Sequence, residues 1–302
     1  MSDALLERLN TLKRERNAVI LGHNYQRPEV QDASDFTGDS LGLSRRAAST
    51  DADVILFCGV HFMAETAAII CPEKSVLIPD PHAGCPMANM ITARELADAK
   101  AEHPGAAVVC YVNSTAEIKA MSDVCCTSAN AVDVVRSIPA DRAVLFVPDQ
   151  SLGSWVARQL GRELILWPGY CPTHHRMLPE HVRAAKEEHP AAEVVVHPEC
   201  LAEVTEMADH VASTSGMLRY CKESRAKEFI VGTETGMLHP LRKENPEKRF
   251  YPVTPLADCP NMKLGTLQKM AWALEDMVYP VEVPPDVAER ARGSIERMLT
   301  TG

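Results

Sequence analysis

Short apolar runs that end next to a polar ring residue occur three times along this chain, at nearly equal intervals. The runs cover 18–21, 107–110 and 194–196, and the ring residues are His23, Tyr111 and His197. Apolar runs bounded by polar residues are typical of buried β-strands. A Cys-Pro pair follows each ring residue after 62, 60 and 62 residues, at Cys85, Cys171 and Cys259. The chain is therefore one unit written three times, and each copy contributes one cysteine.

The same pattern predicts further elements in each copy. Apolar, β-branched runs predict strands at 54–57, 143–147 and 229–231, and two more before the cysteines at 75–79 and 164–168. An amphipathic stretch reaching residue 47 predicts one helical segment after the first strand. Other helices are expected at 3–14, 92–103, 179–188, about 264–277 and about 286–299. Each copy thus alternates strands with helices.

This alternation predicts an α/β fold, because short apolar strands joined by helices form parallel sheets covered on both faces. We expect three similar αβα-sandwich domains around a pseudo-threefold axis. The predicted units are 1–104 with an N-terminal helix, 105–190, and 191–302 with a C-terminal helix. Ligands of parallel sheets bind beyond the carboxyl ends of the strands. Symmetry would therefore bring the ring residues and the three cysteines to one central active site.

Composition narrows the classes of protein to consider. The chain has 302 residues, 46% of them hydrophobic, and a net charge of −10. No basic stripe suggests nucleic acid as a partner, and no run is long enough for a membrane span. The N-terminus has no basic-then-apolar signal pattern. We therefore expect a cytoplasmic protein with no nucleic-acid or membrane partner.

The chain has ten cysteines. In a reducing cytoplasm we expect these to be free thiols rather than disulfides. Seven of them lie in or beside apolar runs and are expected to be structural: Cys58, Cys71, Cys110, Cys125, Cys126, Cys200 and Cys221. Three thiolates in equivalent positions suit two chemistries. One is a catalytic zinc site with an open position, and the other is a 4Fe–4S cluster with one iron left free. A third interpretation is that the three cysteines are loop residues inherited by duplication.

Polar residues near the strand ends favour an active site. Ser40, Ser128 and Thr214 each lie 17 residues after the ring residue of their copy, close to predicted helix starts. Hydroxyls and backbone N–H groups at such places hold anions, although simple N-caps explain each hydroxyl singly.

The chain resembles the quinolinate synthase family over about residues 18–298. The resemblance rests on these motifs together: His23-Asn24-Tyr25-Gln26, Gly38-Asp39-Ser40-Leu41, Phe62-Met63-Ala64-Glu65-Thr66-Ala67, Ala88-Asn89-Met90, Tyr111-Val112-Asn113-Ser114-Thr115-Ala116-Glu117, Thr127-Ser128-Ala129-Asn130-Ala131, His197-Pro198-Glu199-Cys200, Ala212-Ser213-Thr214 and Cys259-Pro260-Asn261-Met262-Lys263.

The resemblance implies a 4Fe–4S cluster held by Cys85, Cys171 and Cys259, with the fourth iron open to substrate. It implies condensation of iminoaspartate with dihydroxyacetone phosphate to quinolinate, phosphate and two waters, in NAD biosynthesis. Tyr25 and Glu199 are then the leading proton-transfer residues, with His197 and Tyr111 also counted as catalytic. The implied cavity residues are His23, Ser40, Tyr111, Asn113, Ser128, His174, His197, Glu199 and Thr214.

Three further expectations follow. Glu199 could act as a base if burial raises its pKa towards neutrality. Both substrates are anions, and Lys263 is the nearest cation in the matched motifs. Iminoaspartate is unstable, so a direct handover from an aspartate-oxidising enzyme is chemically sensible. The alternatives are a zinc-dependent hydrolase or lyase, and an iron–sulfur sensor or electron carrier.

Overall fold

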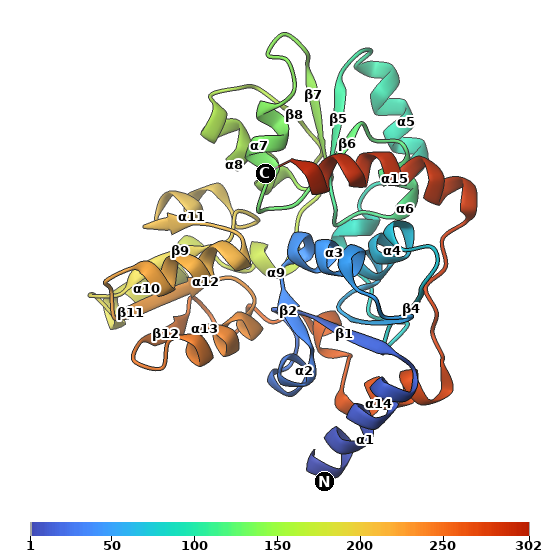
Figure 1. Cartoon of the computed structure of the whole chain (residues 1–302). Coiled ribbons are helices and arrows are strands. Elements are labelled where there is room, and N and C mark those ends of the chain that lie inside the picture. The colour runs from blue at the N-terminus through green and yellow to red at the C-terminus, as the bar shows by residue number, and fades with distance from the viewer. Residues whose placement is uncertain (1, 302) are drawn as a thin grey trace.

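Each of the three sequence copies forms one parallel sheet of four strands in the computed structural model, which describes residues 2–301 (Figure 1). The strand orders are β2-β1-β3-β4, β6-β5-β7-β8 and β10-β9-β11-β12. Helices flank the sheets, and the three copies stand as three lobes around a common centre. The expected α/β fold of three similar αβα units is confirmed.

The first lobe shows the pattern that the other two repeat. Its strands are β1 (Ala18–His23), β2 (Phe36–Gly38), β3 (Val54–Cys58) and β4 (Ser75–Leu77). Its helices are α1 (Ser2–Glu15), α2 (Pro28–Ala33), α3 (Ser40–Ser49) and α4 (His61–Ile70). Gly22 of β1 pairs with Cys58 of β3, so the two central strands end side by side. Figure 1 draws this lobe in blue.

The second and third lobes have the same register at the same place. Cys110 pairs with Val147, and Val196 pairs with Gly232. The second lobe contains β5 (Ala107–Tyr111), β6 (Val124–Cys126), β7 (Val144–Val147), β8 (Ile165–Leu166), α5 (Ala93–Glu102), α6 (Ala116–Ala120), α7 (Ala131–Arg136) and α8 (Gln150–Leu160). The third contains β9 (Glu193–Val196), β10 (His210–Val211), β11 (Glu228–Gly232), β12 (Arg249–Pro252), α10 (Pro179–Glu188), α11 (Ala202–Glu206), α12 (Thr214–Glu223), η2 (Thr235–Met237) and α13 (Leu238–Glu244).

The single helical segment expected up to residue 47 is wrong. The chain there forms α2, the edge strand β2 and then α3, whose N-cap is Asp39. The corresponding edge strands β6 and β10 were not predicted either, and nor was β12. The two or three residues of β2, β6 and β10 are too few to show a period of two. β12 has four residues, but its Arg249 and Pro252 interrupt any apolar run.

The helix that follows each cysteine packs on the next lobe. α5 contacts α6, and α10 contacts β11 and α11. The third such helix, α14 (Leu267–Asp276), returns to the first lobe and contacts α1, α2 and β3. There Met270 and Leu274 share one buried cluster with Leu9, Ile20 and Leu56. The last helix, α15 (Pro285–Thr300), lies against α6 and β6 of the second lobe and α3 and α4 of the first. These contacts close the ring of lobes.

The division of the chain at residues 104 and 190 stays a prediction about the repeated units of sequence. α5 and α10 fall at the ends of those units but pack on the lobes that follow. In each lobe the carboxyl ends of the central strands point towards the centre of the ring, where α9 (Pro172–His175) lies (Figure 1). Within the part of the chain that the structure describes, no helix is long and apolar enough to cross a membrane.

Candidate functional site

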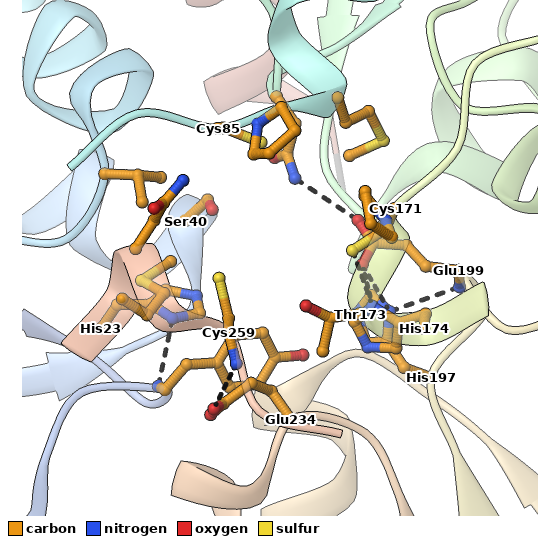
Figure 2. A pocket seen from close by; sticks show the side chains of 18 of the residues that line it. His23, Ser40, Cys85, Cys171, Thr173, His174, His197, Glu199, Glu234 and Cys259 are labelled. Atoms are coloured by element: carbon orange, nitrogen blue, oxygen red, sulfur yellow. Dashed lines mark hydrogen bonds and ion pairs between the residues drawn. The ribbon is translucent and has the colours of Figure 1, made fainter. Parts of the chain in front are cut away.

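One cavity at the junction of the three lobes is lined by every residue that the sequence placed in the site (Figure 2). These are Cys85, Cys171, Cys259, His23, Tyr25, Ser40, Tyr111, Asn113, Ser128, His174, His197, Glu199 and Thr214. Each lobe contributes one cysteine and at least one strand-end residue. The sequence repeat and the family resemblance together therefore predict residues that share the cavity, while their roles remain proposals.

The three cysteines occupy equivalent turns. Each is followed by proline and one helical turn: η1 (Met87–Asn89), α9 and η3 (Pro260–Lys263). Proline suits the first position of such a turn, since its missing N–H would have no partner there. The cysteine carbonyls accept bonds from Ala88, His175 and Met262 N–H at 3.1, 3.0 and 3.1 Å. This shared geometry aims all three side chains at the cavity (Figure 2).

The surroundings of the three thiols differ from those of the other seven cysteines. Cys85, Cys171 and Cys259 are partly exposed, whereas the other seven are buried, as expected for structural residues. Burial of the sulfur raises the pKa of Cys85 to about 12, although the backbone N–H of Ala88 lowers it. Burial likewise raises the pKa of Cys171 and Cys259, against the bonds from the His174 and Met262 turns. Metal ligation would release these protons.

The spacing of the thiols bears on the kind of metal group that would fit. Within residues 2–301, one set of three donor atoms lies within 4.8 Å of one another, and it consists of Cys171, His174 and Glu199. The sulfurs of Cys85, Cys171 and Cys259 line the same cavity without forming such a set. Three thiols spread around one cavity suit a group larger than a single ion. This donor set fits a 4Fe–4S cluster with one iron lacking a cysteine.

The cysteine turns are tied to one another and to the strand ends. Asn261, two residues after Cys259, donates to the carbonyl of Gly84 at 2.7 Å. Buried Glu234 accepts bonds from the Cys259 and Gly236 N–H groups at 3.1 and 2.8 Å. These contacts connect the third turn to the first and to the end of β11.

Lys263, the nearest cation in the matched motifs, does not itself line the cavity. Its ammonium lies 2.9 Å from Glu234 Oε1 and donates to the Tyr25 carbonyl at 2.5 Å. Lys263 thus binds Glu234, whose carboxylate accepts from the Cys259 N–H, and so stabilises the Cys259 turn indirectly. Exposed Arg176, one turn beyond Cys171, is the cation that lines the cavity.

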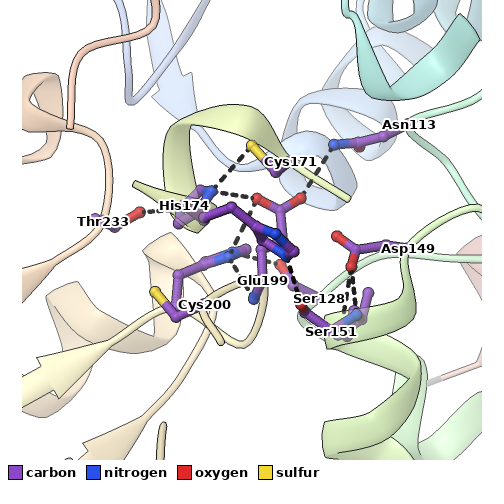
Figure 3. A network of polar contacts seen from close by, with 12 residues as sticks. Asn113, Ser128, Asp149, Ser151, Cys171, His174, Glu199, Cys200 and Thr233 are labelled. Carbon is purple, nitrogen blue, oxygen red and sulfur yellow. Dashed lines mark hydrogen bonds and ion pairs between the residues drawn. The ribbon is translucent and has the colours of Figure 1, made fainter. Parts of the chain in front are cut away.

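Glu199 is the centre of a polar network (Figure 3). Its Oε2 lies 2.7 Å from His174 Nδ1, and its Oε1 accepts from Asn113 Nδ2 at 3.3 Å. The His174 and His197 rings stack with centroids 4.8 Å apart. Tyr25, Asn113 and Glu199 each lie two residues after the ring residue of their copy. The repeat therefore places these three side chains at equivalent points of the cavity wall.

The expectation that burial raises the pKa of Glu199 is wrong. Burial alone would raise it, but the neighbouring rings of His174 and His197 and the Tyr111 hydroxyl lower the pKa of this carboxyl below its usual value. Hydrogen-bond donors that favour the charged form outweigh the loss of solvent. Glu199 is thus ionised at neutral pH, which leaves it able to accept a proton.

Three of the other rings, those of His23, His197 and Tyr25, are held neutral at neutral pH. Burial lowers the pKa of both His23 and His197 to about 3. Both rings accept at Nδ1 from a backbone N–H two residues later, at 3.2 and 3.3 Å. Burial and the charge of Glu199 raise the pKa of Tyr25 well above 10. Two neutral imidazoles and a protonated tyrosine therefore lie close to the ionised Glu199 in the cavity wall.

The three hydroxyls expected to hold an anion lie in the cavity wall, and none of them is a helix N-cap. The caps are Asp39 for α3, Asn130 for α7 and Ser213 for α12. Thr214 Oγ1 accepts from Asn24 Nδ2 at 2.9 Å, and Ser128 Oγ lies 3.1 Å from His197 Nε2.

Sequence reasoning missed several residues at the second central strand of each copy. Thr233 and Glu234 directly follow β11, and Asp149 follows β7 at the position equivalent to Glu234. Asp149 is fully buried, and burial with the charge of Glu199 raises its pKa well above the usual range. The sequence could have indicated these residues, because the parallel strands of a sheet all end at one edge. Residues that follow the second central strand therefore lie near those that follow the first.

The chain is similar to known proteins over nearly its whole length. The family model described as quinolinate synthetase A protein matches residues 7–300. A quinolinate synthase from Dehalococcoides mccartyi is 57% identical over 98% of this chain and 98% of its own length. The quinolinate synthase of Methanosarcina barkeri is 55% identical over 98% and 97%, and that of Thermodesulfovibrio yellowstonii is 52% identical over 99% of both.

Proposed function

The chain belongs to the quinolinate synthetase A family, and from this premise we propose that it condenses iminoaspartate with dihydroxyacetone phosphate. The products are quinolinate, phosphate and two waters, in the biosynthesis of NAD. One observation carries this proposal: three equivalent cysteines, one from each copy, share a single cavity with Glu199, Tyr25 and the hydroxyls. A zinc ribbon or an electron carrier does not need such a cavity.

The side chains of the cavity suit two small anions. The hydroxyls of Ser40, Ser128 and Thr214 come from three different lobes and can each donate to a phosphate or carboxylate oxygen. Asn113 Oδ1 is buried in the cavity wall and has no partner among the described residues. This oxygen is free to accept the N–H of an imine. Arg176 at the rim adds a positive charge that attracts both substrates.

Proton transfer falls to Glu199 and Tyr25. The ionised carboxylate of Glu199 accepts a proton from the carbon or nitrogen that forms the new bond. Tyr25, protonated at neutral pH, gives or accepts a proton at the carbonyl oxygen. Neutral His197 accepts the Glu199 N–H at Nδ1 and donates from Nε2 to Ser128, so it orients the Ser128 hydroxyl towards the substrate.

Cys85, Cys171 and Cys259 would hold a 4Fe–4S cluster, and the open iron of such a cluster supplies a Lewis acid for a hydroxyl or carboxylate. The thiols of the described residues are all free, which suits a reducing cytoplasm as the location. Because iminoaspartate hydrolyses readily, we also propose its direct handover from an aspartate-oxidising enzyme.

A second candidate is a zinc-dependent lyase or hydrolase. It is favoured by the Cys171, His174 and Glu199 atoms, which lie close enough to hold one ion. This site would leave Cys85 and Cys259 without a role.

Purification without oxygen, followed by counts of iron, sulfide and zinc, separates the two. About four irons and four sulfides per chain, lost in Cys85→Ala, Cys171→Ala and Cys259→Ala, are expected, together with quinolinate formation. Cys58→Ala, a buried cysteine outside the cavity, is the matched control and should keep the iron. About one zinc per chain without sulfide would overturn the cluster proposal.

A further inference from the structure

Lys119 is a lysine with none of its surface exposed, and it lies where the second lobe packs on the first. It belongs to α6, and its Nζ donates to the Phe62 carbonyl at 3.2 Å and to Thr66 Oγ1 at 3.0 Å, both on α4 of the first lobe. No carboxylate of the described residues forms an ion pair with it. Glu65, the acid whose charge acts most on Lys119, lies 3.7 Å from His61 instead. A lysine is almost never fully buried without a charged partner, so this position needs a physical reason.

The contacts of the Lys119 amine are those of an ammonium ion. The Thr66 hydroxyl donates its own proton to the Phe62 carbonyl at 2.8 Å, so it presents a lone pair to Nζ. Nζ also lies 5.4 Å from the centre of the Phe62 ring, within the range of a cation–π contact. Burial lowers the pKa of Lys119, whereas the charges of Glu65 and of nearby cysteine thiolates, that of Cys85 among them, raise it. A carbonyl, a hydroxyl lone pair and a ring face all favour the charged form of the amine.

The first turn of α4, which Lys119 binds, forms part of the cavity wall. Phe62 lies in this turn and lines the cavity together with Cys85. His61, the first residue of α4, donates its N–H to the Ala83 carbonyl at 2.7 Å, two residues before Cys85. One turn of helix thus connects the Lys119 ammonium to the loop that carries the first cysteine.

The charges on the cavity wall are mostly negative. Among the described residues that line the cavity, Asp39, Glu199 and Glu234 are acids, and the exposed Arg176 carries the fixed positive charge. Three cysteine thiolates would add negative charge, and reduction of a cluster that they hold would add one electron more. A buried cation acts on such charge through a medium of low dielectric, where water and salt screen it less than they screen an exposed arginine.

We propose that Lys119 is a buried counter-charge for the cavity: its ammonium, held beneath the wall by α4, stabilises the negative charge that the thiolate-held cluster gathers at Cys85. The inference rests on the proposed function for the presence of the cluster. Lys119 contacts neither the cavity nor a cysteine, so it acts through its charge and is not a catalytic residue. The reduction potential of the cluster reports this charge, because a nearby positive charge favours the more negative, reduced state.

Lys119→Met removes the charge and leaves no donor unpaired, because the Phe62 carbonyl keeps its bond from the Thr66 hydroxyl. The chain is purified without oxygen with its cluster, and the potential is measured by a redox titration followed by EPR. We expect reduction of the cluster to be about tenfold less favourable in Lys119→Met, a shift of about 59 mV to more negative potential for one electron. Lys119→Gln, a second neutral replacement, should give the same shift, and Lys119→Arg, which keeps a positive charge, should recover most of it.

Lys248→Met is the matched control. Lys248 is also a buried lysine, its Nζ donates to the Ser224 carbonyl at 2.8 Å, and it lies 5.6 Å from the centre of the Phe229 ring. It is bonded at the end of α12 and does not line the cavity. Its replacement should cost stability, as the loss of any buried lysine with such bonds would, but leave the reduction potential unchanged.

A second readout uses the wild type, so it does not depend on a variant that folds. In the full-length cluster-free chain at neutral pH, ¹⁵N NMR of the lysine side chains should show Lys119 Nζ as an ammonium, assigned by its absence in Lys119→Arg. A neutral amine at Nζ would overturn the inference. An unchanged potential in Lys119→Met with its cluster intact would also overturn it, and so would an equal shift in Lys248→Met. Each of these results leaves the proposed function standing, whereas a wild type without iron and sulfide would refute the proposed cluster and, with it, this role of Lys119.

Discussion

Glu199 is ionised although it is almost fully buried, and the reason is local. His174 and Asn113 donate to its two oxygens, and its own backbone N–H is bonded to His197. A carboxylate surrounded by donors keeps its charge, whereas an isolated buried carboxyl takes up a proton. The same donors fix the direction in which its oxygens face the cavity. The residue is therefore poised as an acceptor before any substrate arrives.

Replacing Glu199 by Gln should abolish its role as a proton acceptor. Gln offers one acceptor oxygen and an NH₂ group, so one of the contacts to His174 and Asn113 would join two donors. We expect quinolinate formation to fall at least about 100-fold, because a general base is lost. Iron and sulfide contents should match the wild type, since the three cysteines are untouched. Near-normal turnover with a full complement of iron would remove Glu199 from the mechanism.

At the residue scale, the sequence predicted the site residues that recur at equivalent positions in the three copies. His23, Tyr111 and His197, the hydroxyls 17 residues later and the cysteines all lie on one cavity because each copy folds alike. Thr233 and Asp149 were missed because their positions differ in type among the copies: the equivalents of Thr233 are Gly59 and Pro148, and that of Asp149 in the first copy is Val60. A comparison of the three copies finds only the residues that the copies share, so a site residue present in a single copy is missed.

At the element scale, the loop that carries Cys85 is held by a helix from the far end of the chain. Asp80 Oδ2 lies 2.5 Å from Lys269 Nζ of α14, and Asp80 Oδ1 accepts from the His82 N–H at 2.8 Å. Burial alone would raise the pKa of Asp80, but the bonds from Lys269 and His82 lower it below its usual value. Asp80 therefore connects strand β4, the cysteine loop and α14.

Asp80→Asn should weaken this connection in a pH-dependent way. At pH 7 we expect the free energy of unfolding to fall by about 1–3 kcal/mol, as for other hydrogen bonds to charged groups. Because the folded-state pKa is lowered, the contribution of Asp80 is fully present above the unfolded pKa of about 3.9 and is lost as pH falls through the folded value. The gap between variant and wild type should thus be constant from pH 5 to 7 and close below about pH 4.

Urea unfolding of the cluster-free proteins at several pH values measures this gap. Asp98→Asn, an exposed carboxyl on α5, is the control and should change stability by less than about 0.5 kcal/mol. A difference between Asp80→Asn and the wild type that persists undiminished at pH 3 would show that the Asp80 charge is not its source.

The central strands and the helices at the ends of the copies were predictable because each is a long apolar or periodic run, whereas α4, α8 and α12 were given no range from the sequence. The strands predicted at 54–57 and 229–231 are β3 and β11, and the helix predicted at 179–188 is α10 with the same bounds. Edge strands such as β10, with two residues, have no period to read. The apolar pattern of a helix also does not show which lobe the helix packs against. The apolar face of α14 predicts only that this face is buried. It does not identify the partners, α1 and β3, which lie more than 200 residues earlier in the chain.

At the scale of the whole molecule, the last helix ties two lobes together. α15 packs on α6 and β6 of the second lobe and on α3 and α4 of the first. Ser294 Oγ donates to the Lys119 carbonyl at 2.8 Å, and the Met298 carbonyl accepts from Asn130 Nδ2 at 3.0 Å. The cavity lies where the lobes meet, so its shape depends on contacts of this kind as well as on its lining.

Ile295→Ala should therefore destabilise the two lobes together. Ile295 is fully buried on α15, and its loss leaves a cavity that costs about 2–5 kcal/mol of unfolding free energy. Glu296→Ala, the exposed neighbour on the same helix, controls for helix propensity and should change stability by less than about 0.5 kcal/mol. Urea unfolding is followed by tryptophan fluorescence, from Trp155 on α8, Trp167 directly after β8 and Trp272 on α14, and by far-UV circular dichroism. If α15 couples the lobes, both signals move to lower urea and stay coincident in Ile295→Ala. Two separated transitions in both the wild type and Ile295→Ala would mean that the lobes unfold independently and that α15 does not couple them.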